Sequence, residues 1–356
     1  MSDDEIDEIF KGTTFGEIIL LTVTFRNTFR RDSKSLKKRK TMKKNYYVLK
    51  KTLRFGGFLV FTTILFQTLI QAQSAVFERE FRVGDGAELS VSTSGGSIEV
   101  TGGSSDRVVV KAFAYSYGKS VSSPDLDNWE ITAEEVGGKI VVKAEKDSNK
   151  GWLRGSNNIS IGFEIEVPTQ TRTEARTSGG RIEISNLMGE QKAYTSGGSL
   201  RAENIMGNIE MRTSGGSIRV EDIQGSADIR TSGGSIRARK VSGGLLARTS
   251  GGSLTLTEIS GKVEARTSGG GIELEMVQPL ESVDVATSGG SVVVEIPEDL
   301  GYDLELRGNR VRTELKNFTG SSTRDYVQGS MNGGGIPIRA RTSGGSVSIR
   351  YHTSMP

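Results

Sequence analysis

The stretch Thr213-Ser-Gly-Gly-Ser-Ile-Arg-Val-Glu-Asp-Ile-Gln-Gly-Ser-Ala-Asp-Ile-Arg230 is one copy of an 18-residue unit that occurs several times in the chain. Its opening motif, Thr-Ser-Gly-Gly, recurs at the same constant step, starting at Thr177, Thr195, Thr213, Thr231, Thr249 and Thr267. The motif returns after a slightly longer interval at Thr287, and outlying copies begin at Thr93 and Thr342. A fixed period of this size is typical of a repeat architecture.

Each unit divides into two similar halves, and in both halves apolar and polar side chains alternate. Such alternation predicts a short strand with one buried face. We expect Gly-Gly at one end of the unit and a lone Gly at the other to form the turns, because Gly tolerates the positive φ of tight corners. Two strands per coil, stacked coil on coil, predict an all-β, single-stranded β-solenoid of 18-residue coils with irregular β caps at both ends.

The positions expected to face inward are apolar in coil after coil, as a stacked core requires. Three columns come from one strand of each coil: Ile182, Leu200, Ile218, Ile236, Leu254, Ile272 and Val292; Ile184, Ala202, Val220, Ala238, Leu256, Leu274 and Val294; and Leu187, Ile205, Ile223, Val241 and Ile259. The opposite strand supplies Ile209, Ala227, Leu245 and Val263, and also Ala193, Met211, Ile229, Ala247 and Ala265.

The repeats are expected to occupy residues 176–296, between two less regular β-rich regions. Residues 73–175 are expected to form an N-terminal β cap and residues 297–356 a C-terminal β cap, with a loop over the polar, Gly-rich residues 317–335. Caps of this kind cover the sheet edges that an open solenoid would expose. No helical pattern is evident after residue 72.

Residues 1–72 differ from the rest of the chain. Residues 1–41 lack a core pattern and are expected to be a spurious or disordered extension, with the true start at Met42. Residues 42–72 have the basic and apolar segments of a signal peptide, and Ile70-Gln-Ala72 is an acceptable cleavage site, which would leave Gln73 first. The alternative is an uncleaved membrane anchor, although the apolar run is shorter than the ~20 residues that span a bilayer.

Composition narrows the function classes. The net charge is +3, and much of the excess lies within residues 1–54, so the rest of the chain gives no general case for nucleic-acid binding. The chain has no Cys, which excludes disulfides, thiolate metal sites, Cys nucleophiles and a lipoprotein Cys.

Three features resemble a bacterial domain-of-unknown-function family that is named for "putative adhesins" and related to the head GIN domain adhesins. They are the Thr-Ser-Gly-Gly-Ser-Ile coils, the lead-in strand that ends Glu166-Val-Pro168, and the closing segment Val293-Val-Glu-Ile-Pro297. The resemblance covers residues 76–351. It implies the repeat fold and an adhesin-like role, and it brings no catalytic residues to carry over.

The residues offer little for catalysis. The only His is His352, near a terminus that is expected to fray. The acids Glu203, Glu210, Glu221, Asp228 and Glu264 are spread over several coils and are expected to lie on solvated strand faces. The turns lack the Asp ligands of calcium-binding β-rolls. We therefore expect no catalytic residues, no cofactor and no metal.

Arginines form the most distinctive outer column: Arg176, Arg212, Arg230, Arg248 and Arg266, with Tyr194 in the second coil. Stacked like charges repel, and acids two residues earlier in most coils are expected to pair with them as a salt-bridged face. In the fourth coil Leu246 replaces that acid, and other basic residues are close in sequence. The alternative to a purely salt-bridged face is an acidic-glycan site made of Arg230, Arg237, Arg239, Lys240 and Arg248.

These observations favour an exported, non-enzymatic protein of the cell envelope or surface, an adhesin-like binding or scaffold module. We expect it in the periplasm, on the outer cell surface or outside the cell, without a membrane span in the mature chain. Its expected partners are acidic polysaccharide, lipopolysaccharide or another envelope protein, and not nucleic acid. The alternative is a carbohydrate-active lyase or hydrolase on a β-helix. Three or more carboxylates in one groove would favour the enzyme, and a flat salt-bridged face the binder.

Overall fold

The structure is a computed structural model that describes residues 75–352, except 85, 104–105, 122–125, 127, 147–157 and 280. The described residues belong to one compact unit, Gln73–Pro356. The expected extension at 1–41, the signal peptide at 42–72 and the start of the mature chain at Gln73 lie outside the described residues. Within those residues, no helix is long and apolar enough to span a membrane.

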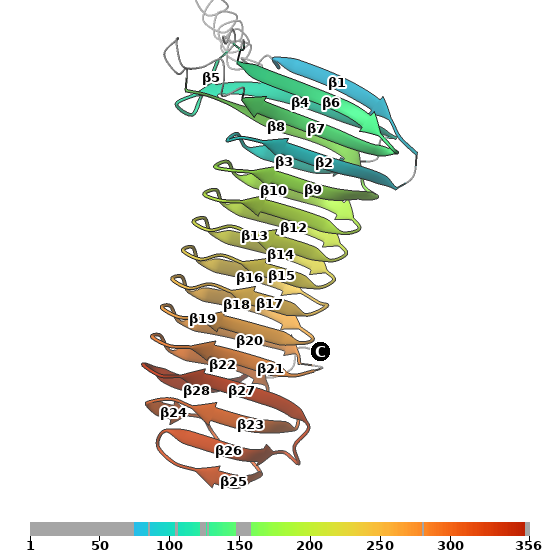
Figure 1. The fold of residues 1–356 in the computed structure, drawn as a ribbon. Coiled ribbons are helices and arrows are strands. Elements are labelled where there is room, and N and C mark those ends of the chain that lie inside the picture. Colours follow the sequence, from blue (N-terminus) through green and yellow to red (C-terminus); the bar gives the residue numbers. More distant parts are fainter. Residues whose placement is uncertain are drawn as a thin grey trace, which may run out of the picture. The chain divides into compact units, whose positions relative to one another are not determined.

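The described strands form two 14-stranded sheets (Figure 1). The first sheet contains, in spatial order, β1 (Phe77–Arg82), β4 (Arg107–Ser116), β8 (Ile159–Pro168), β3 (Ile98–Gly103), β10 (Ile182–Met188), β12 (Leu200–Met206), β14 (Ile218–Gln224), β16 (Ile236–Val241), β18 (Leu254–Ser260), β20 (Ile272–Gln278), β22 (Val292–Pro297), β28 (Ser346–His352) and β24 (Arg310–Arg312), with β5 (Lys119–Ser120) beside β4.

The second sheet contains, from the opposite end, β25 (Phe318–Ser322), β26 (Tyr326–Met331), β23 (Tyr302–Arg307), β27 (Ile336–Thr342), β21 (Val283–Thr287), β19 (Val263–Thr267), β17 (Leu245–Arg248), β15 (Ala227–Arg230), β13 (Ile209–Arg212), β11 (Gln191–Thr195), β9 (Thr171–Thr177), β2 (Ala87–Thr93), β7 (Lys139–Lys146) and β6 (Trp129–Val136).

Each coil joins one strand of the second sheet to one strand of the first through a Thr-Ser-Gly-Gly turn. Neighbouring coils pair in parallel with a shift of one full unit, so that Leu200 lies opposite Ile218 and Ile218 opposite Ile236. All the apolar columns predicted from the sequence are buried between the two sheets. The predicted all-β solenoid is confirmed.

The parallel stack extends beyond residues 176–296. The outlying motifs at Thr93 and Thr342 are also turns of coils: β2 pairs in parallel with β9, and β27 with β21. The insertions after β3 and after β22 therefore interrupt the chain without interrupting the stack (Figure 1).

The two kinds of glycine turn have different physical causes. The lone glycines Gly207 and Gly225 have φ of 144° and 155°, as predicted. For the Gly-Gly pair the predicted cause was wrong, because neither Gly215 nor Gly216 is among the residues with positive φ. Instead, a Cβ on Gly216 would lie 1.9 Å from the carbonyl oxygen of Gly198 in the preceding coil. Close approach of the stacked backbones requires Gly at this corner.

The threonines of the motif hold this corner. Thr231 is buried, its hydroxyl donates to the carbonyl oxygen of Gly216 in the preceding coil at 2.8 Å, and it accepts from the backbone N–H of Gly234 at 3.3 Å. The same arrangement recurs in neighbouring coils, for example at Thr213 and Thr249. The threonine column therefore connects each turn to the one before it.

Residues 317–335 were predicted as a loop, and this prediction was wrong. The segment contains the antiparallel strands β25 and β26, in which Gly320 lies opposite Gly329. The ring of Phe318 lies within 2.9 Å of the place where a Cβ would stand on either glycine, so it covers both. An aromatic ring that fills the space over paired glycines stabilises a strand pair whose own sequence has weak strand propensity.

Candidate functional site

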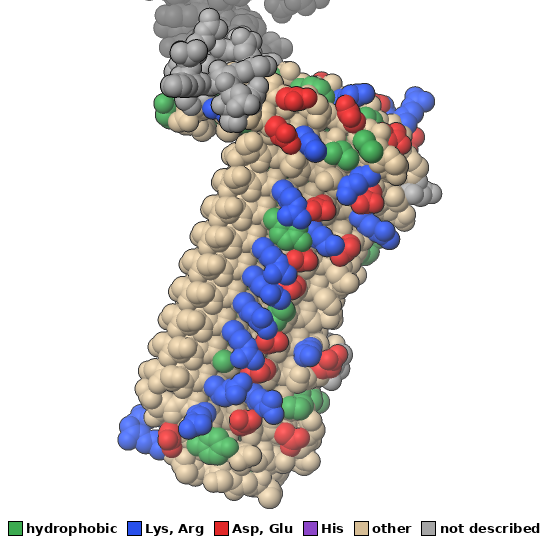
Figure 2. Space-filling view, viewed as in Figure 1, with side chains coloured by type: hydrophobic (Ala, Val, Ile, Leu, Met, Phe, Trp, Pro, Cys, Tyr) green, Lys and Arg blue, Asp and Glu red, His purple; other side chains and the backbone are tan. Residues whose placement is uncertain are grey.

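The outer face of the second sheet carries a column of mostly basic side chains. In strand register the column contains Arg176, Tyr194, Arg212, Arg230, Arg248, Arg266, Ala286 and Arg341. Figure 2 shows Lys and Arg side chains following one another along the stack, with acidic side chains beside them. Parallel, in-register pairing places these residues one above the next because each coil repeats the position of the previous one.

Ion pairs neutralise most of this column, as the sequence predicted. Within single coils, Arg212 lies 2.7 Å from Glu210 and Arg230 2.8 Å from Asp228. At Arg176 the neighbouring ring of Tyr194 adds a cation–π contact at 4.2 Å. These contacts offset the repulsion between stacked like charges.

Ion pairs also form between neighbouring coils, and together with the pairs within coils they make a ladder of ion pairs along the second sheet. Arg248 reaches Glu264 of the next coil at 2.6 Å, and Arg266 contacts Glu264 at 3.0 Å and Asp284 at 2.9 Å. Hydrogen bonds from Arg248 and then Arg266 hold the pKa of the Glu264 carboxyl below its ordinary value. Glu264 therefore remains ionised and connects two coils.

The five residues predicted as an acidic-glycan site do not form one cluster. Arg237, Arg239 and Lys240 lie on β16 of the first sheet, whereas Arg230 and Arg248 lie on β15 and β17 of the second sheet. In a coil with two strands, consecutive strands of the sequence belong to different sheets and face different sides of the molecule. Residues that are close in sequence therefore need not lie on the same face, and these five do not.

The expected excess of positive charge in the fourth coil is also smaller than predicted. Arg239 is hydrogen bonded to Glu221 in one neighbouring coil and to Glu258 in the other. Lys240 has a φ of 53°, in the left-handed corner of its strand, and its ammonium lies 3.8 Å from Asp222. These partners are about one period away in sequence, so comparison between coils would have found them.

A groove on the second sheet lies beside the arginine column, and we call it the arginine groove. Its volume is about 460 Å³. It is lined by Arg230, Thr231, Arg248, Thr249, Ser250, Arg266, Thr267, Ser268, Ala286, Thr287 and Ser288. Guanidinium groups and hydroxyl groups thus line the same depression over several coils.

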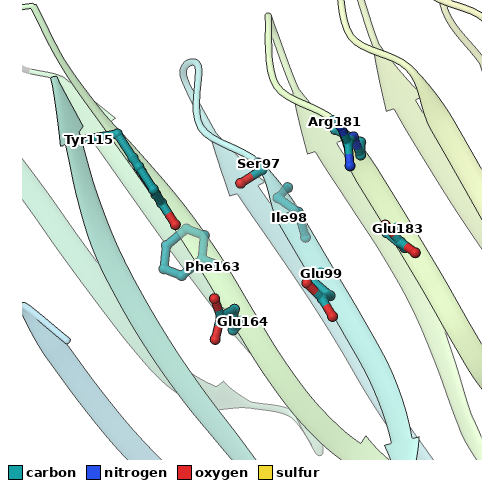
Figure 3. A pocket seen from close by; sticks show the side chains of 8 residues that line it. All are labelled: Ser97, Ile98, Glu99, Tyr115, Phe163, Glu164, Arg181 and Glu183. Atoms are coloured by element: carbon teal, nitrogen blue, oxygen red, sulfur yellow. The ribbon is translucent and has the colours of Figure 1, made fainter. Parts of the chain in front are cut away.

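A second groove, of about 330 Å³, lies on the first sheet near its N-terminal end. Glu164, Glu99 and Glu183 lie opposite one another on β8, β3 and β10, and we call them the glutamate row (Figure 3). Tyr115 and Arg181 also line this groove. Burial first, and then the charges of Glu183 and Glu164, raise the pKa of Glu99, while Arg181 opposes the rise.

Sequence reasoning did not find the glutamate row, although Glu99 and Glu183 stand at the same place after a Thr-Ser-Gly-Gly motif, which was an available signal. Only the sheet order adds Glu164 of β8 to them. Among the described residues, no group of three or more His, Cys, Asp or Glu side chains is arranged to hold a metal ion. His352 lies apart from both grooves, with its Nε2 2.9 Å from the carbonyl oxygen of Met276.

Comparison with known proteins gives a family and two similar structures. A family model described as Toastrack DUF4097 matches residues 87–350. A crystal structure of a "putative adhesin" from Bacteroides fragilis is 12% identical, with 78% of this chain and 96% of that chain covered and a TM-score of 0.32. One of a "putative cell adhesion protein" from Clostridium sporogenes is also 12% identical, with 78% and 99% covered and a TM-score of 0.21. No curated protein matches the chain.

Proposed function

Since this chain belongs to the Toastrack DUF4097 family, we propose that it is an exported, non-enzymatic, adhesin-like protein that binds or scaffolds components of the cell envelope. The signal-peptide pattern of residues 42–72 supports export. The proposed locations are the periplasm, the outer cell surface or the extracellular space. The proposed partners are acidic polysaccharide, lipopolysaccharide or another envelope protein.

The ladder of ion pairs on the second sheet is the observation on which the binding role depends. Arginines and acids are held in fixed positions, coil after coil, by contacts such as those of Arg230 with Asp228 and of Arg266 with both Glu264 and Asp284. A rigid row of preorganised polar groups binds an extended partner at low entropic cost. Such a surface needs no reactive residue.

Fractionation of the native organism followed by N-terminal sequencing of the protein tests the export part of the proposal. We expect a mature protein that begins near Gln73 in an envelope or extracellular fraction. Intact residues 1–72 on protein recovered from the soluble cytoplasmic fraction would contradict it.

The glutamate row favours a second candidate function, a carbohydrate-active enzyme. It places three carboxyl groups in one groove, and the pKa of one of them, Glu99, is raised. Neighbouring strands place the members of the glutamate row ~4.8 Å apart. In glycoside hydrolysis by carboxyl groups about 5 Å apart, one protonates the glycosidic oxygen while the other, as a carboxylate, attacks the sugar and forms a covalent intermediate that water then hydrolyses. Glu99 would be the proton donor, and Glu164 or Glu183 the nucleophile.

Release of reducing ends from a panel of polysaccharides tests this candidate. An enzyme would release them at a rate that Glu99→Gln reduces by at least about a hundredfold. The matched variant Glu203→Gln, on the same sheet outside the groove, should leave the rate unchanged. Absence of release from the whole panel, or equal rates in the wild type and Glu99→Gln, leaves the binding role as the better account.

A further inference from the structure

We infer that the arginine groove binds a linear, carboxylated polysaccharide that runs along the stack of coils. The inference rests on the proposed envelope-binding function and assigns a site and a ligand class to it. The groove is distinct from the five-residue set predicted from sequence, because it excludes the first-sheet residues Arg237, Arg239 and Lys240.

Ala286 interrupts the arginine column at one end of the groove. Its register neighbours on either side are Arg266 and Arg341. A methyl group stands where the pattern of the column would place a long side chain, and Ala286 lines the groove together with Arg266. The repeat itself does not require Ala here, because Arg occupies the same position in the coils before and after.

The described side chains that line the groove include cations but no carboxylate. Three arginines, Arg230, Arg248 and Arg266, line the groove, whereas the carboxylates that pair with them, Asp228, Glu264 and Asp284, are not among its lining residues. At Arg248 the acid position of its own coil is occupied by Leu246, so its carboxylate partner, Glu264, comes from the next coil. A groove lined by arginines and by no carboxylate favours an anionic ligand.

The guanidinium groups are already oriented by the acids beside them. Asp228 engages Nε and Nη2 of Arg230 at 2.8 and 2.9 Å. A guanidinium has five N–H donors, so donors remain for a ligand. Arg also matches the planar geometry of carboxylates, and a side chain that is fixed in advance loses little entropy on binding.

The repeat spacing suits a polymer. Neighbouring strands are ~4.8 Å apart, so Arg230, Arg248 and Arg266 present guanidinium groups over a span of roughly 10 Å. The exposed Ser250, Ser268 and Ser288 line the same groove and can exchange hydrogen bonds with sugar hydroxyl groups. A linear chain of uronic acids offers both carboxylates and hydroxyl groups along its length.

Isothermal titration calorimetry with galacturonic-acid tetramer at low salt tests the inference, with neutral maltotetraose as the ligand control. The full mature chain should bind the acidic tetramer, and binding should weaken as salt screens the charges. Arg248→Gln should weaken it about tenfold, the size expected for loss of one charge-assisted hydrogen bond. Ala286→Arg should also weaken it at least about fivefold, because the new side chain fills the groove.

Arg237→Gln is the matched control, because it removes the same charge from the first sheet. It should change affinity less than about twofold. Tighter binding by Ala286→Arg, or equal losses of affinity in Arg248→Gln and Arg237→Gln, would show that the tetramer is attracted by the net charge of the protein. Either result would contradict binding in the arginine groove. If the tetramer binds and neither Arg248→Gln nor Ala286→Arg changes its affinity, the arginine groove is not the binding site. That result would leave the proposed function intact.

Two further results concern the identity of the ligand. Binding to purified lipopolysaccharide without binding to the tetramer would overturn the carboxylated ligand class. Binding of neither ligand would overturn the inference and also remove acidic glycans from the partners in the proposed function.

Discussion

At the scale of single residues, the Thr-Ser-Gly-Gly corner shows why one short motif is repeated so strictly. Thr231 bonds its hydroxyl to the preceding coil and to its own turn. The two glycines that end the motif are not equivalent. A Cβ on Gly216 would meet backbone at 1.9 Å, whereas a Cβ on Gly215 would make only an ordinary contact at 3.7 Å.

Ala substitutions at these two glycines should therefore differ sharply. Gly216→Ala must push neighbouring coils apart and is expected to lower the free energy of unfolding by more than about 3 kcal/mol. Gly215→Ala should change it by less than about 1 kcal/mol. Urea denaturation of both variants measures the difference, and similar losses would show that the corner is not limited by the close approach of backbones.

At the scale of strands, the ion-pair ladder of the second sheet joins coils that hydrogen bonds and apolar columns already hold in register. Glu264 contacts arginines from two coils, Arg248 and Arg266. These arginines lower the pKa of its carboxyl group. A carboxyl group with a depressed pKa in the folded state stabilises the fold above its unfolded pKa, and this stabilisation is lost as the pH falls through the folded pKa.

The stability of the wild type should therefore fall more steeply between pH 7 and about pH 3 than that of Glu264→Gln, which has no carboxyl group to protonate at this position. At pH 7 the variant should be the less stable of the two. Thermal unfolding at several pH values measures both effects. Glu134→Gln, at an exposed position on the edge strand β6, is the control and should follow the wild type. Parallel curves for Glu264→Gln and the wild type would contradict a stabilising role for this pair.

At the scale of the whole described unit, the coils form a nearly one-dimensional stack. Each coil contacts mainly the coils before and after it, so stability is close to a sum over coils and their interfaces. Neighbouring coils also share one register, as the equivalence of Ile218 and Ile236 shows. We therefore expect the protein to tolerate the loss of a whole coil, provided that the remaining coils keep this register.

Deletion of residues 213–230 removes one full unit and joins Arg212 to Thr231, which restores the natural Arg-Thr-Ser-Gly-Gly sequence. We expect a folded protein with the same β-type circular dichroism and a cooperative transition at a lower temperature. Deletion of residues 213–221 removes half a unit and one Thr-Ser-Gly-Gly turn, and it should give aggregated or unfolded protein. Equal behaviour of the two deletions would contradict a structural unit of this length.

The sequence by itself determined the coils, because a strict period leaves few choices. Once Ile218 and Ile236 occupy equivalent positions in consecutive units, parallel pairing and burial of one face follow from alternation and stacking. The pairing of Arg230 with Asp228 could be predicted for the same reason, since both lie on one face of one short strand.

Tertiary structure decided what the period does not encode. The glutamate row depends on β3 lying between β8 and β10, an order set by long-range pairing of segments separated by an insertion. The arginine groove depends on Ala286 and on the division of each coil between two sheets, which separates Arg237 from Arg248. The repeat specifies the strands of the coils, their buried faces and their parallel pairing, but the neighbours of non-repeat strands such as β8, and hollows in the surface, arise only when distant segments pack together.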